Sequence, residues 1–394
     1  MVFDFGMRTS LLLLGFVQGI IFVVLSWRRG VEEERLSDRL LAVLLLLLCL
    51  YIAQYMLGFA GWYDSHNFLT VFMFYFPFHH YLLIPPIVFY YFRSLTNSEF
   101  KLEQKDWWHF LPGALYILWY LLSFLYEVVL QQMMLGVPLP LFYETKGYWA
   151  QFNQDLFQDV IFILGFVSTY FYLVLTFREY SKYKTYVEAN FSQADQLKFT
   201  WLRNILIAVI IGFTLNWMII LLDAFVLPMT YRQFWFSHLG VAILIYFLSI
   251  LGYSSRPNPR VKLAFDPTTI SPAPTSSTEL DADLLPIKDR LAKLMKQEHP
   301  YLNPELNLKE LAQGVRATPS QLSKVINSGF GKNFNDFINE YRVEAIKEKL
   351  RAGEAELHTL MSIALDCGFN SKATFNRAFK KFTAQSPKAY LEGL

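Results

Sequence analysis

Two short stretches near the C-terminus combine amide, hydroxyl and basic side chains at helical spacing, which suits the reading of nucleic acid. Such side chains can reach base edges in a major groove, and other basic groups bind phosphates, which position a protein on DNA without reading its sequence. The outward positions of the first stretch are Ser320, Gln321, Ser323, Lys324 and Asn327. Those of the second stretch are Ser371, Lys372, Thr374, Asn376, Arg377, Lys380 and Lys381. The residues that we expect at phosphates are Lys332, Arg342, Lys380 and Lys381.

Each stretch is the second member of a predicted helix pair. Short helices are expected over 306–315 and 360–367, and turn residues follow them at 317–319 (ATP) and 368–370 (GFN). A longer helix over 334–352 joins the pairs and ends at Gly353, a residue that often terminates helices. This order predicts two helix-turn-helix units, whose second helices could enter major grooves one helical turn apart.

These motifs resemble the DNA-binding domain of the AraC family of bacterial regulators over Tyr301–Tyr390. The resemblance rests on LKELA at 308–312, PSQLSKVIN at 319–327 and FNDFINEYRVEA at 334–345, and most specifically on IALDCGFNSKATFNRAFKKFTAQSP at 363–387. Ala384 departs from the glycine that usually precedes the family's Ser-Pro. The resemblance implies that both recognition helices bind double-stranded promoter DNA and, as is common in the family, that the domain contacts RNA polymerase.

Hydropathy and charge divide the 394-residue chain into unlike halves. Hydrophobic residues make up 54% and charged residues 17%, which is too apolar for an ordinary soluble protein. From Leu284 onward, however, there are 17 Lys and Arg against 12 Asp and Glu, a net charge of +5, whereas the preceding part carries −3. The tail therefore has a mild electrostatic footprint for nucleic acid, and the first half needs an apolar environment.

The first half contains seven apolar segments that are each near the roughly 20 residues needed to cross a bilayer as a helix. They lie at about 10–27, 40–60, 68–92, 107–127, 156–177, 201–222 and 234–251. Continuous apolar runs exclude strands, since an open sheet edge cannot be satisfied in lipid. We therefore predict an all-α chain in three parts. These are a seven-helix transmembrane domain over 1–251, a flexible Pro/Ser/Thr-rich linker over 252–283 and a helix-turn-helix domain over 284–394.

The charges of the loops predict an orientation in an inner, cytoplasmic membrane. The loops after the first, third and fifth segments hold clusters of Arg and Lys, whereas the opposite side has only Arg8, Lys146 and Arg232. The positive-inside rule then places the N-terminus outside and the C-terminal domain in the cytoplasm, where DNA is accessible. A proline pair, Pro85-Pro86, is expected to kink the third segment.

Polar residues inside the predicted spans are costly, so they are candidates for a ligand pocket. They are Gln54, His79, His80, Glu127, Asp155, Asp159, Asn216, Asp223 and His238. One interpretation is a pocket open to the outside that binds a small-molecule or lipid signal. The alternative is that Glu127, Asp155 and Asp223 lie at helix ends among lipid headgroups.

No cofactor, metal site, disulfide or enzymatic activity is expected, because the sequence offers no nucleophile–base pair, and Cys49 and Cys367 fall in different halves. The combined features predict a membrane-embedded one-component transcription regulator that senses a signal, acts on promoter DNA and works as a homodimer. A second hypothesis is a transporter or membrane enzyme with a regulatory tail. A third is a passive membrane anchor from which proteolysis in the linker releases the tail.

Overall fold

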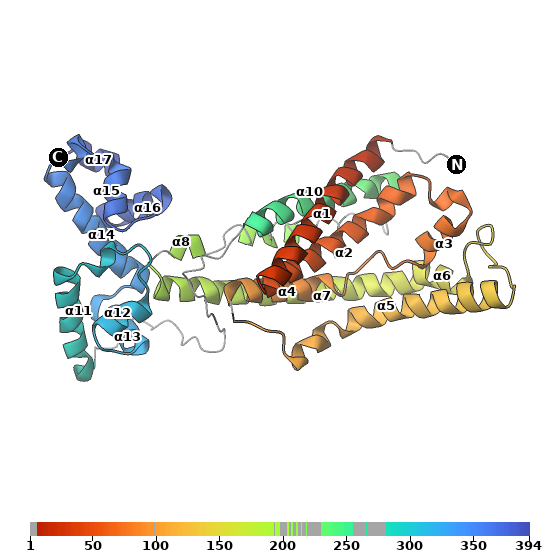
Figure 1. Cartoon of the computed structure of the whole chain (residues 1–394), viewed down its shortest axis with the longest axis horizontal. Helices are drawn as coiled ribbons and strands as arrows, with labels where there is room; N and C mark the ends of the chain where they lie inside the picture. The colour runs from red at the N-terminus through yellow and green to blue at the C-terminus, as the bar shows by residue number, and fades with distance from the viewer. Residues whose placement is uncertain are drawn as a thin grey trace. The chain divides into compact units, whose positions relative to one another are not determined.

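The computed structural model describes residues 6–97, 99–192, 194–197, 230–254, 265 and 281–394, with isolated positions between 203 and 218 (Figure 1). Every regular element in these ranges is a helix, and isolated bridges join Leu141 to Lys146 and Phe191 to Asn307. The all-α fold predicted from the sequence is thus confirmed. The chain divides into two compact units, Met1–Arg178 with Trp201–Ala264 and Glu179–Thr200 with Phe265–Leu394.

In the first unit, helices α1 (Met7–Glu32), α2 (Leu36–Phe59) and α10 (Tyr231–Ser254) pack side by side (Figure 1). Small residues permit the close approach, because a Cβ added at Gly15 would lie 2.8 Å from the Cβ of Ala242. At one end, the buried guanidinium of Arg29 joins all three helices. It donates to both carboxylate oxygens of Asp38 at 2.8 and 2.6 Å, and to the carbonyl oxygen of Tyr253 at 2.7 Å.

The third apolar segment is divided into two helices rather than kinked. α3 (Phe68–Tyr75) ends well before α4 (Ile84–Thr96) begins, and the eight residues between them carry His79 and His80. Pro85 and Pro86 occupy the first turn of α4. Proline is favoured there because the first N–H groups of a helix have no intrahelical acceptor. The predicted proline kink is therefore wrong: the prolines start a helix after the break.

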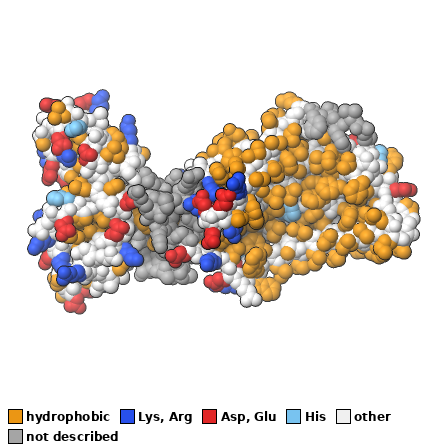
Figure 2. Space-filling model, in the orientation of Figure 1, with side chains coloured by type: hydrophobic (Ala, Val, Ile, Leu, Met, Phe, Trp, Pro, Cys, Tyr) orange, Lys and Arg blue, Asp and Glu red, His pale blue; other side chains and the backbone are white. Residues whose placement is uncertain are grey.

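Five described helical stretches are long and apolar enough to cross a membrane. They are Met7–Glu32, Leu36–Phe59, Leu111–Met134, Tyr148–Asn190 and Tyr231–Ser254. The third combines α5 (Leu111–Phe124) with a π-helical continuation, and the fourth combines α6 (Tyr148–Phe152), a π-helical turn and α7 (Gln158–Asn190). Most of the predicted segment 201–222 lies outside the described residues. Figure 2 shows hydrophobic side chains covering the visible face of the first unit.

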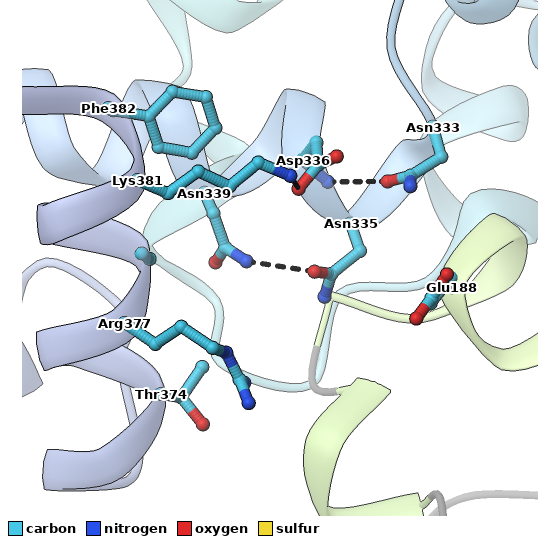
Figure 3. Close-up of a pocket in the computed structure, with 10 residues that line it drawn as sticks. Glu188, Asn333, Asn335, Asp336, Asn339, Thr374, Arg377, Lys381 and Phe382 are labelled. Carbon is cyan, nitrogen blue, oxygen red and sulfur yellow. Dashed lines mark hydrogen bonds and ion pairs between the residues drawn. The ribbon is translucent and has the colours of Figure 1, made fainter. Parts of the chain in front are cut away.

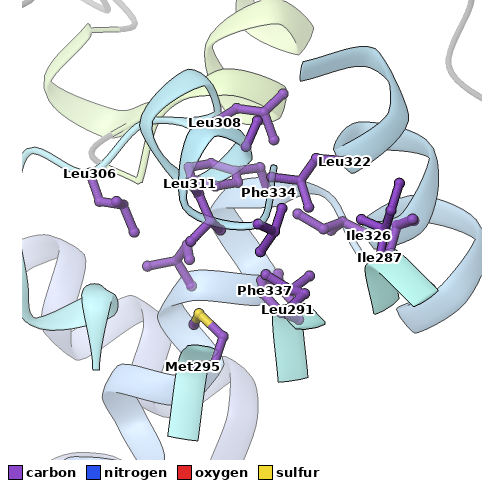
Figure 4. Close-up of a cluster of buried hydrophobic side chains, with 14 of the residues drawn as sticks. Ile287, Leu291, Met295, Leu306, Leu308, Leu311, Leu322, Ile326, Phe334 and Phe337 are labelled. Atoms are coloured by element: carbon purple, nitrogen blue, oxygen red, sulfur yellow. The ribbon is translucent and has the colours of Figure 1, made fainter. Parts of the chain in front are cut away.

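The second unit holds the helices predicted for the tail, together with the end of α7 and the short α8 (Ala194–Leu197). Its helices are α11 (Leu285–Gln297), α12 (Leu308–Gly314), α13 (Pro319–Phe330), α14 (Phe334–Arg351), α15 (Leu360–Asp366), α16 (Lys372–Thr383) and α17 (Pro387–Glu392). Side chains from α11 to α14 form one apolar core (Figure 4), and side chains from α14 to α17 form another. The helix α14 contributes to both cores, so it joins the two halves of the domain.

Residues 179–200 belong by their contacts to this second unit, although the sequence assigned them to the membrane domain. The structure describes only 252–254, Phe265 and 281–283 of the predicted linker. Phe265 is buried, and its ring lies 5.3 Å from that of Tyr183 and 5.5 Å from that of Tyr186, both on α7. One point of the linker is thus held against the end of α7.

Candidate functional site

The first candidate recognition helix is α13, which follows α12 after a tight turn. Thr318 caps α13: its hydroxyl accepts from the N–H of Gln321 at 3.2 Å, and the Gln321 side chain accepts from the N–H of Thr318 at 2.9 Å. Leu322, Val325 and Ile326 are buried in the core, as the helical spacing predicted. The apolar face therefore fixes which side of α13 is turned outward.

The predicted contact residues of α13 are on that outward side. Ser320, Gln321 and Lys324 are exposed, and Ser323 and Asn327 are half-buried. Lys324 donates to Asp281 at 2.6 Å, but this pair is largely solvent-exposed and so contributes little to stability. Lys324 can therefore exchange Asp281 for a DNA phosphate at small cost.

The second candidate recognition helix is α16, which follows α15 after a turn at Gly368, where φ is +89°. Ser371 caps α16 by accepting from the N–H of Thr374 at 3.2 Å. Thr374 is buried and its hydroxyl accepts from Ser371 at 2.8 Å, so both residues serve the cap. The remaining predicted residues are exposed: Lys372, Asn376, Arg377, Lys380 and Lys381.

Arg342 has a structural position that the sequence did not indicate. Its side chain is 1% exposed, and it donates to the carbonyl oxygens of Tyr301 and Asn303, both at 2.8 Å. Its guanidinium also lies 5.7 Å from the ring centre of Phe369 in the other half-core. Burial lowers the pKa of Arg342 to about 9, so the group stays charged at neutral pH. The predicted phosphate contact is replaced by a buried charge that joins the two halves of the domain.

Two predicted phosphate-binding lysines are held in ion pairs within the domain. Lys332 pairs with Glu340, and Lys381 pairs with Asp336 at 2.7 Å. Asp336, Arg377 and Lys381 also line a pocket of about 260 Å³ (Figure 3). Its remaining lining is Glu188, Asn333, Asn335, Asn339, Thr374, Ala378 and Phe382. One side of α16 thus faces a polar hollow whose far wall includes Glu188 of α7.

Comparisons with known proteins agree with this geometry. A family model described as a helix-turn-helix domain matches residues 311–393. Residues 311–393 form a helix-turn-helix domain of the AraC type. Two elements before residue 311 also contribute side chains to the first core: helix α11 and the first residues of α12.

Several curated regulators are similar to the chain over this domain alone. An uncharacterized HTH-type transcriptional regulator of Staphylococcus aureus (strain COL) is 39% identical over 90 residues, which are 23% of this chain and 12% of that protein. The regulatory protein PocR of Salmonella typhimurium (strain LT2) is 26% identical over 105 residues, 27% of this chain and 34% of that protein. The chain thus spans about an eighth of the length of the staphylococcal relatives. No solved structure matches the chain.

Four of the residues predicted for a membrane pocket lie in the first unit's interior or near it. Gln54, His79, His80 and His238 are buried or half-buried, and three of them contact one group of tyrosines. The His238 ring stacks on Tyr55 at 3.6 Å and on Tyr51 at 4.7 Å between ring centres. Further members are His79, which lies 5.2 Å from both Tyr51 and Tyr81, and Gln54, which donates to Tyr63 at 3.1 Å. We call this group, with Tyr231 stacked on Tyr55, the His/Tyr cluster.

The His/Tyr cluster and adjacent His80 contain buried polar atoms without a hydrogen-bond partner among the described residues. They are Oε1 of Gln54, both ring nitrogens of His80 and Nε2 of His238. The Nδ1 of His238 lies 3.0 Å from the carbonyl oxygen of Phe234, to which it can only donate. Since unpaired buried polar groups are costly, these atoms are available to a polar ligand or to ordered water.

Three other predicted pocket residues, Glu127, Asp155 and Asp159, do not join the His/Tyr cluster. Glu127 is buried, and its carboxylate accepts from the Tyr75 hydroxyl and the Trp149 N–H, both at 2.7 Å, and from the Ala150 N–H at 3.1 Å. It therefore caps the start of α6 and has a structural role. Asp155 and Asp159 are exposed. The residues Asn216 and Asp223 lie outside the described residues.

Sequence reasoning missed the tyrosines of the His/Tyr cluster and the contact of residues 191–192 with the C-terminal domain. The tyrosines Tyr51 and Tyr55 are spaced i, i+4 on α2, which places them on one helix face, but tyrosine is common in membrane helices as an interfacial residue. The spacing alone therefore gave no reason to single them out. The signal that could have found them is the position of Tyr51 one turn before Gln54, at i, i+3 on the same helix.

Proposed function

We propose that the chain is a membrane-embedded one-component transcription regulator. The observation that carries this proposal is the double helix-turn-helix domain, in which each of two half-cores presents an outward polar helix, α13 or α16. The two helices enter major grooves about one helical turn apart on the same face of the duplex. The five long apolar helical stretches, which lie wholly or mostly in the first unit, provide the membrane anchor.

The domain acts in the cytoplasm, with the N-terminus of the chain on the outer side of the inner membrane. The distribution of Arg and Lys among the loops supports this orientation. The same basic residues at the end of α7, Arg178, Lys182 and Lys184, are followed directly by residues that pack on the DNA-binding domain. In this orientation the basic loop residues and the DNA-binding domain lie on the same side of the membrane.

The signal is a small molecule or lipid that hydrogen-bonds in the His/Tyr cluster. Support comes from the unpaired Nε2 of His238 and Oε1 of Gln54, which a polar ligand group can engage. The stacked aromatic rings around them suit a flat or apolar ligand body. Binding changes the packing of α2 and α10, and a homodimer places two tails on paired DNA sites, where RNA polymerase is contacted.

Chromatin immunoprecipitation of the tagged full-length protein tests the DNA-binding part of this proposal. An Arg377→Ala/Lys324→Ala double variant is the control, because both side chains are exposed and their loss leaves the cores intact. We expect peaks that share a motif split by about one helical turn and that disappear in the control. Peaks that persist in the double variant would contradict the assignment of α13 and α16.

The sensing part is tested by His238→Phe, which keeps an aromatic ring against Tyr55 and removes Nε2. We expect promoter occupancy that varies with growth conditions in the wild type and stays fixed in this variant. Tyr246→Phe is the matched control, because it removes one polar atom from an exposed side chain of the same helix. Occupancy that still varies in His238→Phe would remove the His/Tyr cluster from the proposal.

A further inference from the structure

The end of α7 makes a hydrogen-bonded contact with the DNA-binding domain. We call residues 179–192 the α7 extension. At its tip, Ser192 is 1% exposed and Phe191 is 9% exposed, so both are buried against their neighbours. Phe191 forms an isolated antiparallel bridge with Asn307, the residue that caps α12. A segment that leaves a membrane helix is thus packed directly against the first helix-turn-helix unit.

Ser192 is the centre of this contact. Its N–H donates to the carbonyl oxygen of Leu306 at 3.2 Å, and its hydroxyl donates to that of Pro304 at 3.2 Å. The side-chain amide of Asn335, on α14, donates to the carbonyl oxygen of Ser192 at 2.8 Å. Backbone and side chain are both engaged, so the contact is specific in its geometry and does not depend on apolar burial alone.

The same serine reaches the residue that joins the two halves of the domain. The guanidinium of Arg342 donates to the Ser192 hydroxyl at 3.2 Å, while it also donates to Tyr301 and stacks near Phe369. Gly368, before the second recognition helix, has no room for a Cβ beside Arg342 and the carbonyl oxygen of Tyr301. The tip of the α7 extension therefore touches the point at which the second half meets the first.

The α7 extension also adds negative charge beside α16. Glu188 lines the pocket that Arg377 and Lys381 line from the other side (Figure 3). A DNA phosphate bound by Lys381, on the side of α16 where Arg377 is expected to reach a base edge, would approach the Glu188 carboxylate, and like charges at short range repel. The docked extension and a phosphate at this side of α16 therefore compete.

From these contacts we propose that the α7 extension is an autoinhibitory element that holds the DNA-binding domain in a state of low DNA affinity. The inference rests on the proposed function, and it adds the route by which the membrane unit controls the reader. When the bundle changes its packing, α7 moves, the tip at Ser192 undocks and the pocket side of α16 becomes available to DNA.

The test compares Ser192→Leu with wild type in the full chain, reconstituted in lipid nanodiscs, using a 40-base-pair duplex selected from a randomized pool by the wild-type protein. Leucine cannot replace the bonds of Ser192, and the change leaves every residue of the DNA-binding helices in place. We expect DNA affinity to rise about tenfold, within the usual range of coupling between sites. Ser181→Leu, the same change at an exposed position of α7, should leave affinity unchanged.

A second variant separates release of the tip from unfolding. In the pair Ser192→Cys/Asn335→Cys, the two thiols are joined by a short thiol-reactive cross-linker with a reducible bond. The two positions are neighbours, because the Asn335 side-chain amide donates to the Ser192 carbonyl oxygen at 2.8 Å. Cross-linking should lower DNA affinity below that of the wild type, and cleavage of the linker by a reductant should reverse this loss. The native thiols Cys49 and Cys367 are buried and do not compete.

The outcomes are distinct. Increased affinity in Ser192→Leu with reversible loss in the cross-linked pair supports autoinhibition. Two results overturn it: affinity of Ser192→Leu that is equal to or lower than that of the wild type, and full binding by the cross-linked form. Failure of every form to select any duplex would instead overturn the proposed function, and the inference with it.

Discussion

Replacing Arg342 with methionine separates a structural role from a DNA contact. Methionine fills a similar length of space but cannot donate to the carbonyl oxygens of Tyr301 and Asn303, which lie 2.8 Å from the guanidinium. A buried acceptor that loses its donor costs about 1–3 kcal/mol, so two of them suggest a loss of about 3 kcal/mol in the free energy of opening of the domain. That loss corresponds to a roughly 150-fold larger population of opened molecules.

The assay uses Cys367, a natural reporter in the second half-core. Its side chain is fully buried, and burial raises the pKa of the Cys367 thiol to about 11, so the closed domain does not react. In a Cys49→Ala background, the rate at which a thiol reagent labels Cys367 under native conditions measures opening. We expect Arg342→Met to be labelled about 150 times faster than the parent, by the estimate above.

The control is Arg351→Met, on the same helix but exposed, where the side chain donates only to the Tyr390 hydroxyl at 3.1 Å. Surface changes of this kind usually alter stability by less than about 0.5 kcal/mol, so labelling should be nearly unchanged. If Arg342→Met is labelled at the parental rate, while the slope of DNA affinity against salt falls by about 1, the arginine binds phosphate and our assignment is refuted.

Three further changes test the caps and the DNA contacts. Glu127→Gln places an amide against three hydrogen-bond donors, which should cost about 1–3 kcal/mol and lower the midpoint of thermal unfolding in micelles. The control Glu144→Gln, at an exposed site, should leave the midpoint unchanged. An unchanged midpoint in Glu127→Gln would leave Glu127 available as a ligand group. Ser371→Ala removes the cap of α16 and should cost about 1 kcal/mol, seen as faster thiol labelling; a parental rate would show that the cap contributes nothing. Arg377→Ala should relax base preference at one position of a selected motif, whereas Lys380→Ala should weaken binding to all sequences alike; equal effects would remove the distinction between base and phosphate contacts.

The helices of the C-terminal domain could be predicted because each carries its own local signals. The helix expected over 334–352 is observed as Phe334–Arg351, and Ser371 stands directly before α16 as a cap. Apolar positions at helical spacing indicated which side of α13 and α16 is turned inward. These features depend on residues a few positions apart, so a single sequence contains them.

The role of Arg342 could not be predicted, because its partners are distant backbone groups. The apolar stripe of α14 indicated one buried face, but two half-cores pack on this helix and bury most of its circumference. The carbonyl oxygens of Tyr301 and Asn303 and the hydroxyl of Ser192 carry no sequence signal of their own. The break between α3 and α4 was missed for a related reason: apolar residues continue through it, so hydropathy alone indicated a single span.

Two segments of the chain, the predicted linker over 252–283 and helix α7, could connect the first unit to the DNA-binding domain, and they differ in the signal that they can transmit. The sequence predicts a flexible linker over 252–283, and such a linker would convey only spacing or association. By contrast, α7 is one helix of 33 residues, about 50 Å long, whereas a bilayer core needs only about 20 residues, or 30 Å. In the proposed mechanism its last turns extend beyond the bilayer core, so that a tilt or rotation of α7 is the route by which the signal reaches Ser192.

The strength of the docked contact suits control by a ligand. Four hydrogen bonds centred on Ser192 contribute net stabilisation of about 1 kcal/mol each, somewhat more for the one from the charged Arg342, and part of that is lost to the ordering of the segment. Coupling between sites in proteins is typically about 1–3 kcal/mol, which is the same order. In the proposed mechanism, a signal bound at the His/Tyr cluster thus shifts the docking equilibrium without unfolding either unit. A contact made from a large apolar interface would be too stable for such a signal to release.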